Sequence, residues 1–294
     1  MEEHSDRWSQ WLLERRDAGS RSQRAKTTDR LVPVRDRVLD AADPLAGATL
    51  LDVGTGDGLI GLGALDRVGA TGTVIFSDIS ERLLDECVKS VARRAATDRA
   101  SFVVTDAGRL DGVDDGSVDV ITTRSVLIYV ADKPAAFAAF RRVLRPGGRI
   151  SLFEPINRLM YPEPPGRFYG YDLSSLGDLV RKVTAAFADA ADSASSDAMM
   201  GFDDRDLADL AQHAGFAGVH VECHIDIAPG LVRPVSLEAL LDGAPNPNAP
   251  TVREAISASL SGDEQSRFVD GLAHAFATTE PIEKLVVAYV SARL

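Results

Sequence analysis

Glycines and a carboxylate mark the end of a short apolar run near residue 50. The run 49–53 contains Asp52 and leads directly into Gly54, Gly56 and Gly58. Glycine adopts backbone dihedrals that are closed to other residues, and it lets a ligand approach without meeting a Cβ atom. The spacing therefore predicts a turn that cradles a nucleotide-like cofactor at the end of a strand.

The spacing of these glycines also bears on the kind of cofactor. A dinucleotide site requires G-x-G-x-x-G directly after the strand, and counting from Gly54 places Leu59 where the third glycine is needed. Counting from Gly56 succeeds through Gly58 and Gly61, but that register starts two residues later. The pattern weakens a dinucleotide site without removing it.

Three further apolar runs end in residues that can bind a ligand. They are 74–78, which ends in Asp78; 102–104, which is followed by Asp106 and Ala107; and 118–122, which leads to Arg124 and Ser125. The carboxyl ends of parallel strands lie at one edge of a sheet, where ligands bind in open α/β folds. We therefore expect these residues to face the glycine turn.

The motif D-x-G-x-G-x-G, these strand ends and the later run Leu144-Arg145-Pro146-Gly147-Gly148 resemble the class I S-adenosylmethionine-dependent methyltransferases. The resemblance covers roughly residues 31–153 well and the remainder loosely. It implies S-adenosylmethionine as cofactor, S-adenosylhomocysteine as product, and in-line methyl transfer to an O, N or C atom of a small molecule or peptide. We interpret the Pro-Gly-Gly segment as a structural β-turn.

The resemblance implies a role for each strand-end residue. Asp52 would orient the glycine loop, Asp78 would accept hydrogen bonds from the ribose hydroxyls, and Asp106 would accept from the adenine amino group. The implied cofactor-binding set is Asp52, Gly54, Thr55, Gly56, Gly58, Asp78, Ile79, Asp106, Ala107, Arg124 and Ser125. Structural alternatives stay open, since Asp106 can stabilise its own turn and Arg124 can pair with Asp119.

Alternating strand and helix patterns predict an α/β fold. We expect a doubly wound, mostly parallel seven-stranded sheet with helices on both faces and an antiparallel last strand, which the resemblance implies. The expected division is an N-terminal helical lid (1–30), a Rossmann-like core (31–153), a lid insertion (154–203), and the rest of the core (204–294) with a helical insertion at about 235–277.

Several local features within this division are also predicted. Ser5 can cap a helix that carries Trp8 and Trp11, and a second helix is expected over 31–42. Prolines and aromatics make the segment 160–171 neither ordinary strand nor helix. A Ser/Ala/Asp-rich link is expected near 193–196.

Composition narrows the class of protein. The 294 residues carry a formal net charge of −12, which argues against a general nucleic-acid binder. Cys87 and Cys223 lie in different predicted elements, so neither a disulfide framework nor a thiolate metal site is indicated. No apolar stretch approaches 18 residues, so we expect no membrane partner and a cytoplasmic enzyme. The excess of arginine over lysine and the abundant alanine favour a bacterial source, and the oligomeric state, monomer or homodimer, stays open.

Methyl transfer depends mainly on holding the acceptor in line with the methyl carbon, so a dedicated base is optional. If one is used, Glu154 is the first candidate and His213 the second. An ion pair is the structural alternative for Glu154, and a partly buried packing position is the alternative for His213. His220 and His224 share a strand face, but no third ligand is apparent, so we expect no metal.

Aromatic residues could form a chamber for the acceptor. The candidates are Trp8, Trp11, Met160, Tyr161, Phe168 and Tyr169, with natural-product tailoring as the expected setting. Ordinary packing of the tryptophans is the alternative.

Two other functions stay open at this point. One is an NAD-dependent oxidoreductase, for which Tyr129 and Lys133 match the relay spacing Tyr-x-x-x-Lys, although Lys133 also lies at a helix start before Pro134. The other is a non-methylating protein on the same fold that binds S-adenosylmethionine.

Overall fold

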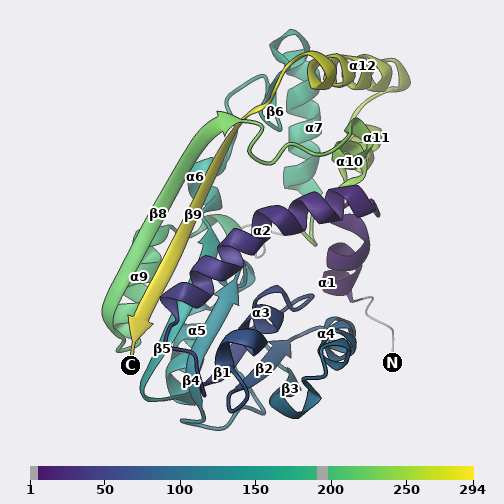
Figure 1. The fold of residues 1–294 in the computed structure, drawn as a ribbon. Coiled ribbons are helices and arrows are strands. Elements are labelled where there is room, and N and C mark those ends of the chain that lie inside the picture. The colour runs from purple at the N-terminus through teal and green to yellow at the C-terminus, as the bar shows by residue number, and fades with distance from the viewer. Residues whose placement is uncertain (1–5, 191–197) are drawn as a thin grey trace, which may run out of the picture. The chain divides into compact units, whose positions relative to one another are not determined.

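The computed structural model describes residues 6–190 and 198–294 (Figure 1). The chain forms two compact units, and each is assembled from three stretches of sequence. The sheet unit comprises Asp29–Arg158, Asp197–Cys223 and Val287–Leu294; the helical unit comprises Met1–Thr28, Leu159–Ser196 and His224–Val286.

A seven-stranded sheet has the order β3-β2-β1-β4-β5-β9-β8. Its strands are β1 (Thr49–Val53), β2 (Thr73–Asp78), β3 (Ala100–Val104), β4 (Val118–Arg124), β5 (Leu144–Pro155), β8 (Ala217–Pro229) and β9 (Ile282–Arg293). The first five pair in parallel, whereas β9 runs antiparallel to β5. The predicted fold class and the antiparallel last strand are confirmed.

Helices and short 3₁₀ turns connect the strands of the sheet unit. They are the end of α2 (Arg21–Ala41), α3 (Leu59–Val68), α4 (Glu81–Arg93), η2 (Thr97–Arg99), η3 (Leu127–Tyr129), α5 (Lys133–Val143) and α9 (Asp204–His213). Helices α3 and α4 pack on each other, while α5 packs on β5 and α9. Strand order reverses between β1 and β4, and right-handed crossovers therefore put α5 on the other face of the sheet.

The helical unit has an apolar core of its own. Its elements are α1 (Arg7–Gln10), the π-helical turn η1 (Trp11–Arg15), the start of α2, the end of α6 (Asn157–Met160), β6 (Arg167–Phe168), β7 (Tyr171–Asp172), η4 (Ser174–Leu176), α7 (Gly177–Ala190), α10 (Leu237–Asp242), α11 (Val252–Ser259) and α12 (Gly262–Thr278). Phe168 and Val183 from the first insertion share this core with Val252 and Phe268 from the second. The two sequence insertions thus pack together as one body.

The N-terminal expectations need two corrections. The first helix is capped by Asp6, whose side chain accepts from the Ser9 amide at 3.1 Å; Ser5 lies outside the described residues. The second helix begins at Arg21 rather than Leu31, because contacts distant in sequence hold its polar first half.

Two loop expectations were also wrong. Pro146-Gly147-Gly148 lies within β5, where Gly147 has φ +79° and the pairing with β4 shifts register between Val118 and Val120. The segment 160–171 includes the paired strands β6 and β7. The link expected near 193–196 lies outside the described residues. Over the described ranges, no helix is long and apolar enough to span a membrane.

Candidate functional site

The glycine loop after β1 depends on left-handed backbone at three positions. Gly54, Gly56 and Gly58 have φ of +63°, +57° and +87°, which side chains disfavour. A Cβ at Gly54 would lie 2.5 Å from the Val126 Cγ2 atom. Glycine is therefore required at position 54, because the Val126 side chain fills the space that another side chain would need.

Asp52 supports this loop from beneath. Its buried carboxylate accepts from the Thr55 hydroxyl at 2.7 Å, the Gly61 amide at 2.9 Å and the Thr122 hydroxyl at 2.9 Å. Burial raises the pKa of Asp52 from 3.8 to about 6, although these hydrogen bonds and the Arg124 charge oppose the rise. The predicted role of orienting the loop agrees with these contacts.

Asp78, at the end of β2, touches the same loop. One carboxylate oxygen accepts from the Gly56 amide at 2.9 Å and the other from the Ser80 amide at 3.0 Å. The carboxylate of Asp78 thus lies directly beside the glycine loop, where the resemblance implies contact with the ribose hydroxyls.

The residues predicted to contact the adenine ring, Asp106 and Ala107, follow β3. The Thr105 amide donates to the Asp78 carbonyl at 2.9 Å, which joins the two strand ends. The exposed Asp106 accepts from the Gly108 amide at 2.8 Å through one oxygen, so it does stabilise its own turn. Ala107 is buried and Ile79 is 49% exposed, an apolar surface beside the two acids.

The end of β4 brings Arg124 to the glycine loop. Its guanidinium is close enough to lower the pKa of Asp52, and Asp119 pairs with Arg145 at 2.9 Å. Ser125 has φ +57°, and its amide donates to the Phe153 carbonyl at 2.8 Å. A strained serine held in this way fixes the direction of the loop that follows β4.

Glu154, the first candidate base, is fully buried at the end of β5. Its carboxylate accepts from the amides of Val126 and Leu127 at 3.0 Å each, from the Ile128 amide at 3.1 Å and from the Thr123 hydroxyl at 3.3 Å. Burial raises the pKa of Glu154 from 4.5 to about 7 against these bonds. Glu154 therefore fixes the start of η3 through hydrogen bonds to its amides.

His213, the second candidate base, is exposed at the last turn of α9, with Nδ1 2.7 Å from the Asp209 carbonyl oxygen. The next two carbonyls, of Ala214 and Gly215, accept from Arg141 near the end of α5. A crossover helix runs back along the sheet, so the end of α5 lies at the edge opposite the glycine loop. We propose no base role for His213.

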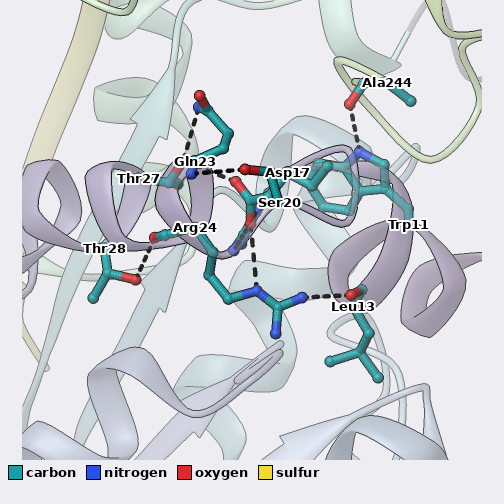
Figure 2. A network of polar contacts seen from close by, with 10 residues as sticks. Trp11, Leu13, Asp17, Ser20, Gln23, Arg24, Thr27, Thr28 and Ala244 are labelled. Atoms are coloured by element: carbon teal, nitrogen blue, oxygen red, sulfur yellow. Dashed lines mark hydrogen bonds and ion pairs between the residues drawn. The ribbon is translucent and has the colours of Figure 1, made fainter. Parts of the chain in front are cut away.

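The residues predicted for the acceptor chamber all belong to the helical unit. Trp11 donates through Nε1 to the Ala244 carbonyl at 2.9 Å (Figure 2). Phe168 is buried against Phe268, with ring centroids 5.4 Å apart. Trp11 and Phe168 therefore have packing roles.

The other chamber residues are more accessible. Trp8 and Met160 are half-buried, and the Arg7 guanidinium lies 5.7 Å from the Trp8 ring. Tyr169 has φ +50°, and Glu163 accepts from its amide at 3.0 Å. Tyr161 is 51% exposed, which suits contact with a ligand.

Sequence reasoning missed two threonines in β4. Successive side chains of a strand face opposite sides of the sheet. Thr122 accordingly reaches Asp52 on one side and Thr123 reaches Glu154 on the other. The available signal was the pair of hydroxyl residues at the end of an otherwise apolar strand.

Within the part of the chain that the structure describes, no group of three His, Cys, Asp or Glu residues could hold a metal ion. His220 lies 3.5 Å from Glu222, its neighbour on the same face of β8.

The chain matches known proteins over most of its length. The model of the ubiE/COQ5 methyltransferase family matches residues 32–228. Nocamycin O-methyltransferase of Saccharothrix syringae is 36% identical over 217 residues, which are 71% of this chain and 72% of that protein. Aklanonic acid methyltransferase DauC of Streptomyces sp. (strain C5) is 31% identical over 156 residues, 50% of this chain and 68% of that one. The crystal structure of the YcgJ protein from Bacillus subtilis aligns with a TM-score of 0.56 at 16% identity, covering 88% of this chain and 97% of that one.

Proposed function

The chain belongs to the ubiE/COQ5 methyltransferase family and is an S-adenosylmethionine-dependent methyltransferase, and from this premise we propose that it methylates an acidic oxygen of a small molecule. The resemblance inferred from the strand-end motifs is thereby confirmed, together with the cofactor. The similarity to nocamycin O-methyltransferase, which spans 71% of this chain, carries the choice of a small-molecule oxygen.

We propose that the strand-end residues hold the cofactor as the resemblance implies. The left-handed glycines let a ligand approach the loop, Asp78 places a carboxylate beside that loop for the ribose hydroxyls, and Asp106 has a second oxygen for the adenine amino group. These features fit S-adenosylmethionine. When bound, this cofactor would supply an electrophilic methyl carbon: an oxygen lone pair of the acceptor would form the new O–C bond as the C–S bond breaks, and the C–S electron pair would leave on sulfur as the thioether.

We propose an acidic acceptor oxygen because neither candidate base is placed to remove a proton from the acceptor. Glu154 is fully buried, where its carboxylate accepts from three backbone amides and a threonine hydroxyl, and His213 lies at the far edge of the sheet. An acceptor that is already ionised, such as a carboxylate or an acidic enol, has no proton to lose in the transfer step. Holding its oxygen in line can then supply about 7–11 kcal/mol of the barrier reduction. The name of one relative, aklanonic acid methyltransferase, fits an acidic acceptor.

Neither alternative function is favoured, because the family match is to methyltransferases. The hypothesis of an NAD-dependent oxidoreductase also required Tyr129 and Lys133 as a proton relay, and the contacts of Lys133 do not support that role. The Lys133 ammonium donates to the carbonyls of Val130 at 3.0 Å and Ala198 at 2.8 Å, and it lies 4.4 Å from the Phe202 ring. Desolvation lowers its pKa. These contacts fit a structural lysine.

The setting is also part of the proposal. We infer a bacterial, cytoplasmic enzyme of natural-product tailoring, since two similar proteins are actinomycete enzymes named for small molecules. Tyr161 and Tyr169 are our candidates for acceptor contact. Whether the enzyme acts as a monomer or a homodimer stays a prediction.

The first test is calorimetric titration with S-adenosylmethionine, S-adenosylhomocysteine and NAD, using the wild type and Asp78→Ala. We expect micromolar binding of both adenosyl ligands, at least a tenfold loss in Asp78→Ala, and no binding of NAD. Candidate acids are then screened by mass spectrometry for the gain of one methyl group, across a pH range that spans their ionisation.

Asp78 also anchors two amides, so two controls are needed. Asp78→Asn keeps the shape and one acceptor oxygen, and Asp66→Ala removes an exposed aspartate of α3 in the same unit. Circular dichroism checks the fold of each. NAD binding alone would contradict the cofactor assignment, and transfer confined to amines or carbon acids would contradict the oxygen acceptor.

A further inference from the structure

Glu154 connects the end of β5 to the segment after β4. Three consecutive amides, those of Val126, Leu127 and Ile128, donate to its carboxylate at 3.0–3.1 Å. They are the otherwise unsatisfied donors at the start of η3, so Glu154 serves as a cap supplied from another strand. Within η3 and its N-terminal neighbour Val126, no side chain provides this cap.

The position of Val126 is what links Glu154 to the glycine loop. Its amide is held by Glu154, and its side chain occupies the space beside Gly54, where an added Cβ would meet the two Val126 methyl carbons at 2.5 and 3.1 Å. The carboxylate of Glu154, the side chain of Val126 and the backbone of Gly54 therefore form a continuous series of contacts. The series ends at the loop proposed to hold the cofactor.

The charged and titratable groups around Glu154 come from three elements. Lys133 of α5 lowers the pKa of Glu154, Tyr129 of η3 feels the charges of both Glu154 and Arg124, and Arg124 ends β4. Asp206 of α9 in turn raises the pKa of Lys133, against the larger effect of desolvation. Because burial dominates, Glu154 has a pKa of about 7. Its ionised form makes charge-assisted bonds to the amides, which are about twice as strong as neutral ones.

We propose that Glu154 is a positioning residue: its ionised carboxylate fixes Val126 against Gly54 and so sets the shape of the glycine loop that binds S-adenosylmethionine. This inference rests on the proposed function of that loop. Proton uptake by Glu154 loosens the segment 126–128 and weakens cofactor binding. Glu154 thus acts without touching the acceptor.

The test measures S-adenosylmethionine affinity by calorimetry between about pH 6 and 8 in the wild type, Glu154→Gln, Val126→Ala and the double variant. A matched control is Glu163→Gln, because Glu163 likewise holds two consecutive amides, those of Tyr169 and Gly170, but in the helical unit. The amino group of the ligand titrates alike with every protein, so the comparison cancels it.

We expect the wild-type affinity to rise several-fold through the pKa of Glu154, and Glu154→Gln to bind about tenfold more weakly at pH 8 with no such rise. Val126→Ala should also weaken binding, and Glu154→Gln should add little to it, since both break the same series of contacts. Glu163→Gln should bind as the wild type does.

Several outcomes would overturn the inference. They are wild-type affinity in Glu154→Gln, an unchanged pH profile in that variant, and full additivity with Val126→Ala. If Glu154→Gln does not fold, normal cofactor affinity in Val126→Ala has the same force. A wild type that binds no S-adenosylmethionine would instead contradict the proposed function.

Discussion

At the scale of single residues, Gly61 explains why two glycine registers coexist in the sequence. Its amide donates to Asp52 at 2.9 Å, and a Cβ placed there would lie 2.4 Å from the Phe76 ring. Gly61 is therefore required for close packing of α3 on β2 and not for a turn. The dinucleotide-like register through Gly56, Gly58 and Gly61 arises from this packing requirement.

Gly61→Ala should consequently destabilise the protein. Forcing a methyl group against the Phe76 ring is an overpacking change that costs about 1–3 kcal/mol. Gly262→Ala is the matched control: this glycine starts α12 with no atom within 4 Å of the added Cβ, so we expect between no change and about 1 kcal/mol of stabilisation. Urea unfolding measures both. Equal effects of the two substitutions would contradict the packing argument.

At the scale of elements, local signals predicted the sheet unit well. Helices α3 and α4 follow β1 and β2 in the predicted alternation of strand and helix, and α4 starts after the Ser80 cap, whose hydroxyl accepts from the Leu83 amide at 3.1 Å. The first half of α2 was missed because it is polar and is held by distant residues: Lys26 donates to the Arg233 carbonyl at 2.7 Å. Such contacts join positions far apart in the chain, which periodicity does not report.

The candidate site follows the same division. Asp52, the glycines and Asp78 were predictable, because each lies at a strand end with a motif of its own. The position of Val126 after β4 was not predictable, since it depends on a hydrogen bond to Glu154 of the neighbouring strand β5. The shared core of the two insertions was equally out of reach, because nothing local pairs Phe168 with Phe268.

The N-terminal segment provides a prediction for this scale. Trp11 donates to the Ala244 carbonyl, and Arg24 and Thr27 converge on the buried Asp17 (Figure 2). Trp11→Phe keeps an aromatic ring but removes one partly buried hydrogen bond and part of the packing, so it should cost at least about 1 kcal/mol of unfolding free energy. Thermal unfolding measures this cost. A change in the acceptor KM without any loss of stability would instead favour the predicted acceptor role of Trp11.

At the scale of the whole molecule, the buried acids Asp52 and Glu154 make the stability of the fold depend on pH. They lie on opposite faces of β4, where they bond to Thr122 and Thr123. Burial outweighs hydrogen bonding at Asp52 and at Glu154, so both keep their protons to a higher pH in the folded chain than in the unfolded chain. Their contribution to stability is fully present below about pH 4. It is lost progressively as the pH rises through about 6 for Asp52 and about 7 for Glu154.

The free energy of unfolding of the ligand-free protein should therefore fall between about pH 4 and 7, by on the order of 3 kcal/mol for each acid. Urea titrations across this range measure it, with Asp52→Asn and Glu154→Gln each expected to flatten one part of the curve. The net charge of −12 also penalises the folded state as remaining groups ionise, but salt screens that repulsion and not the burial cost. A fall that persists at high salt and disappears when Asp52→Asn and Glu154→Gln are combined would assign the pH dependence to the two acids. A fall abolished by salt alone would assign it to surface charge, and the buried carboxylates would then have near-ordinary pKa values despite their surroundings.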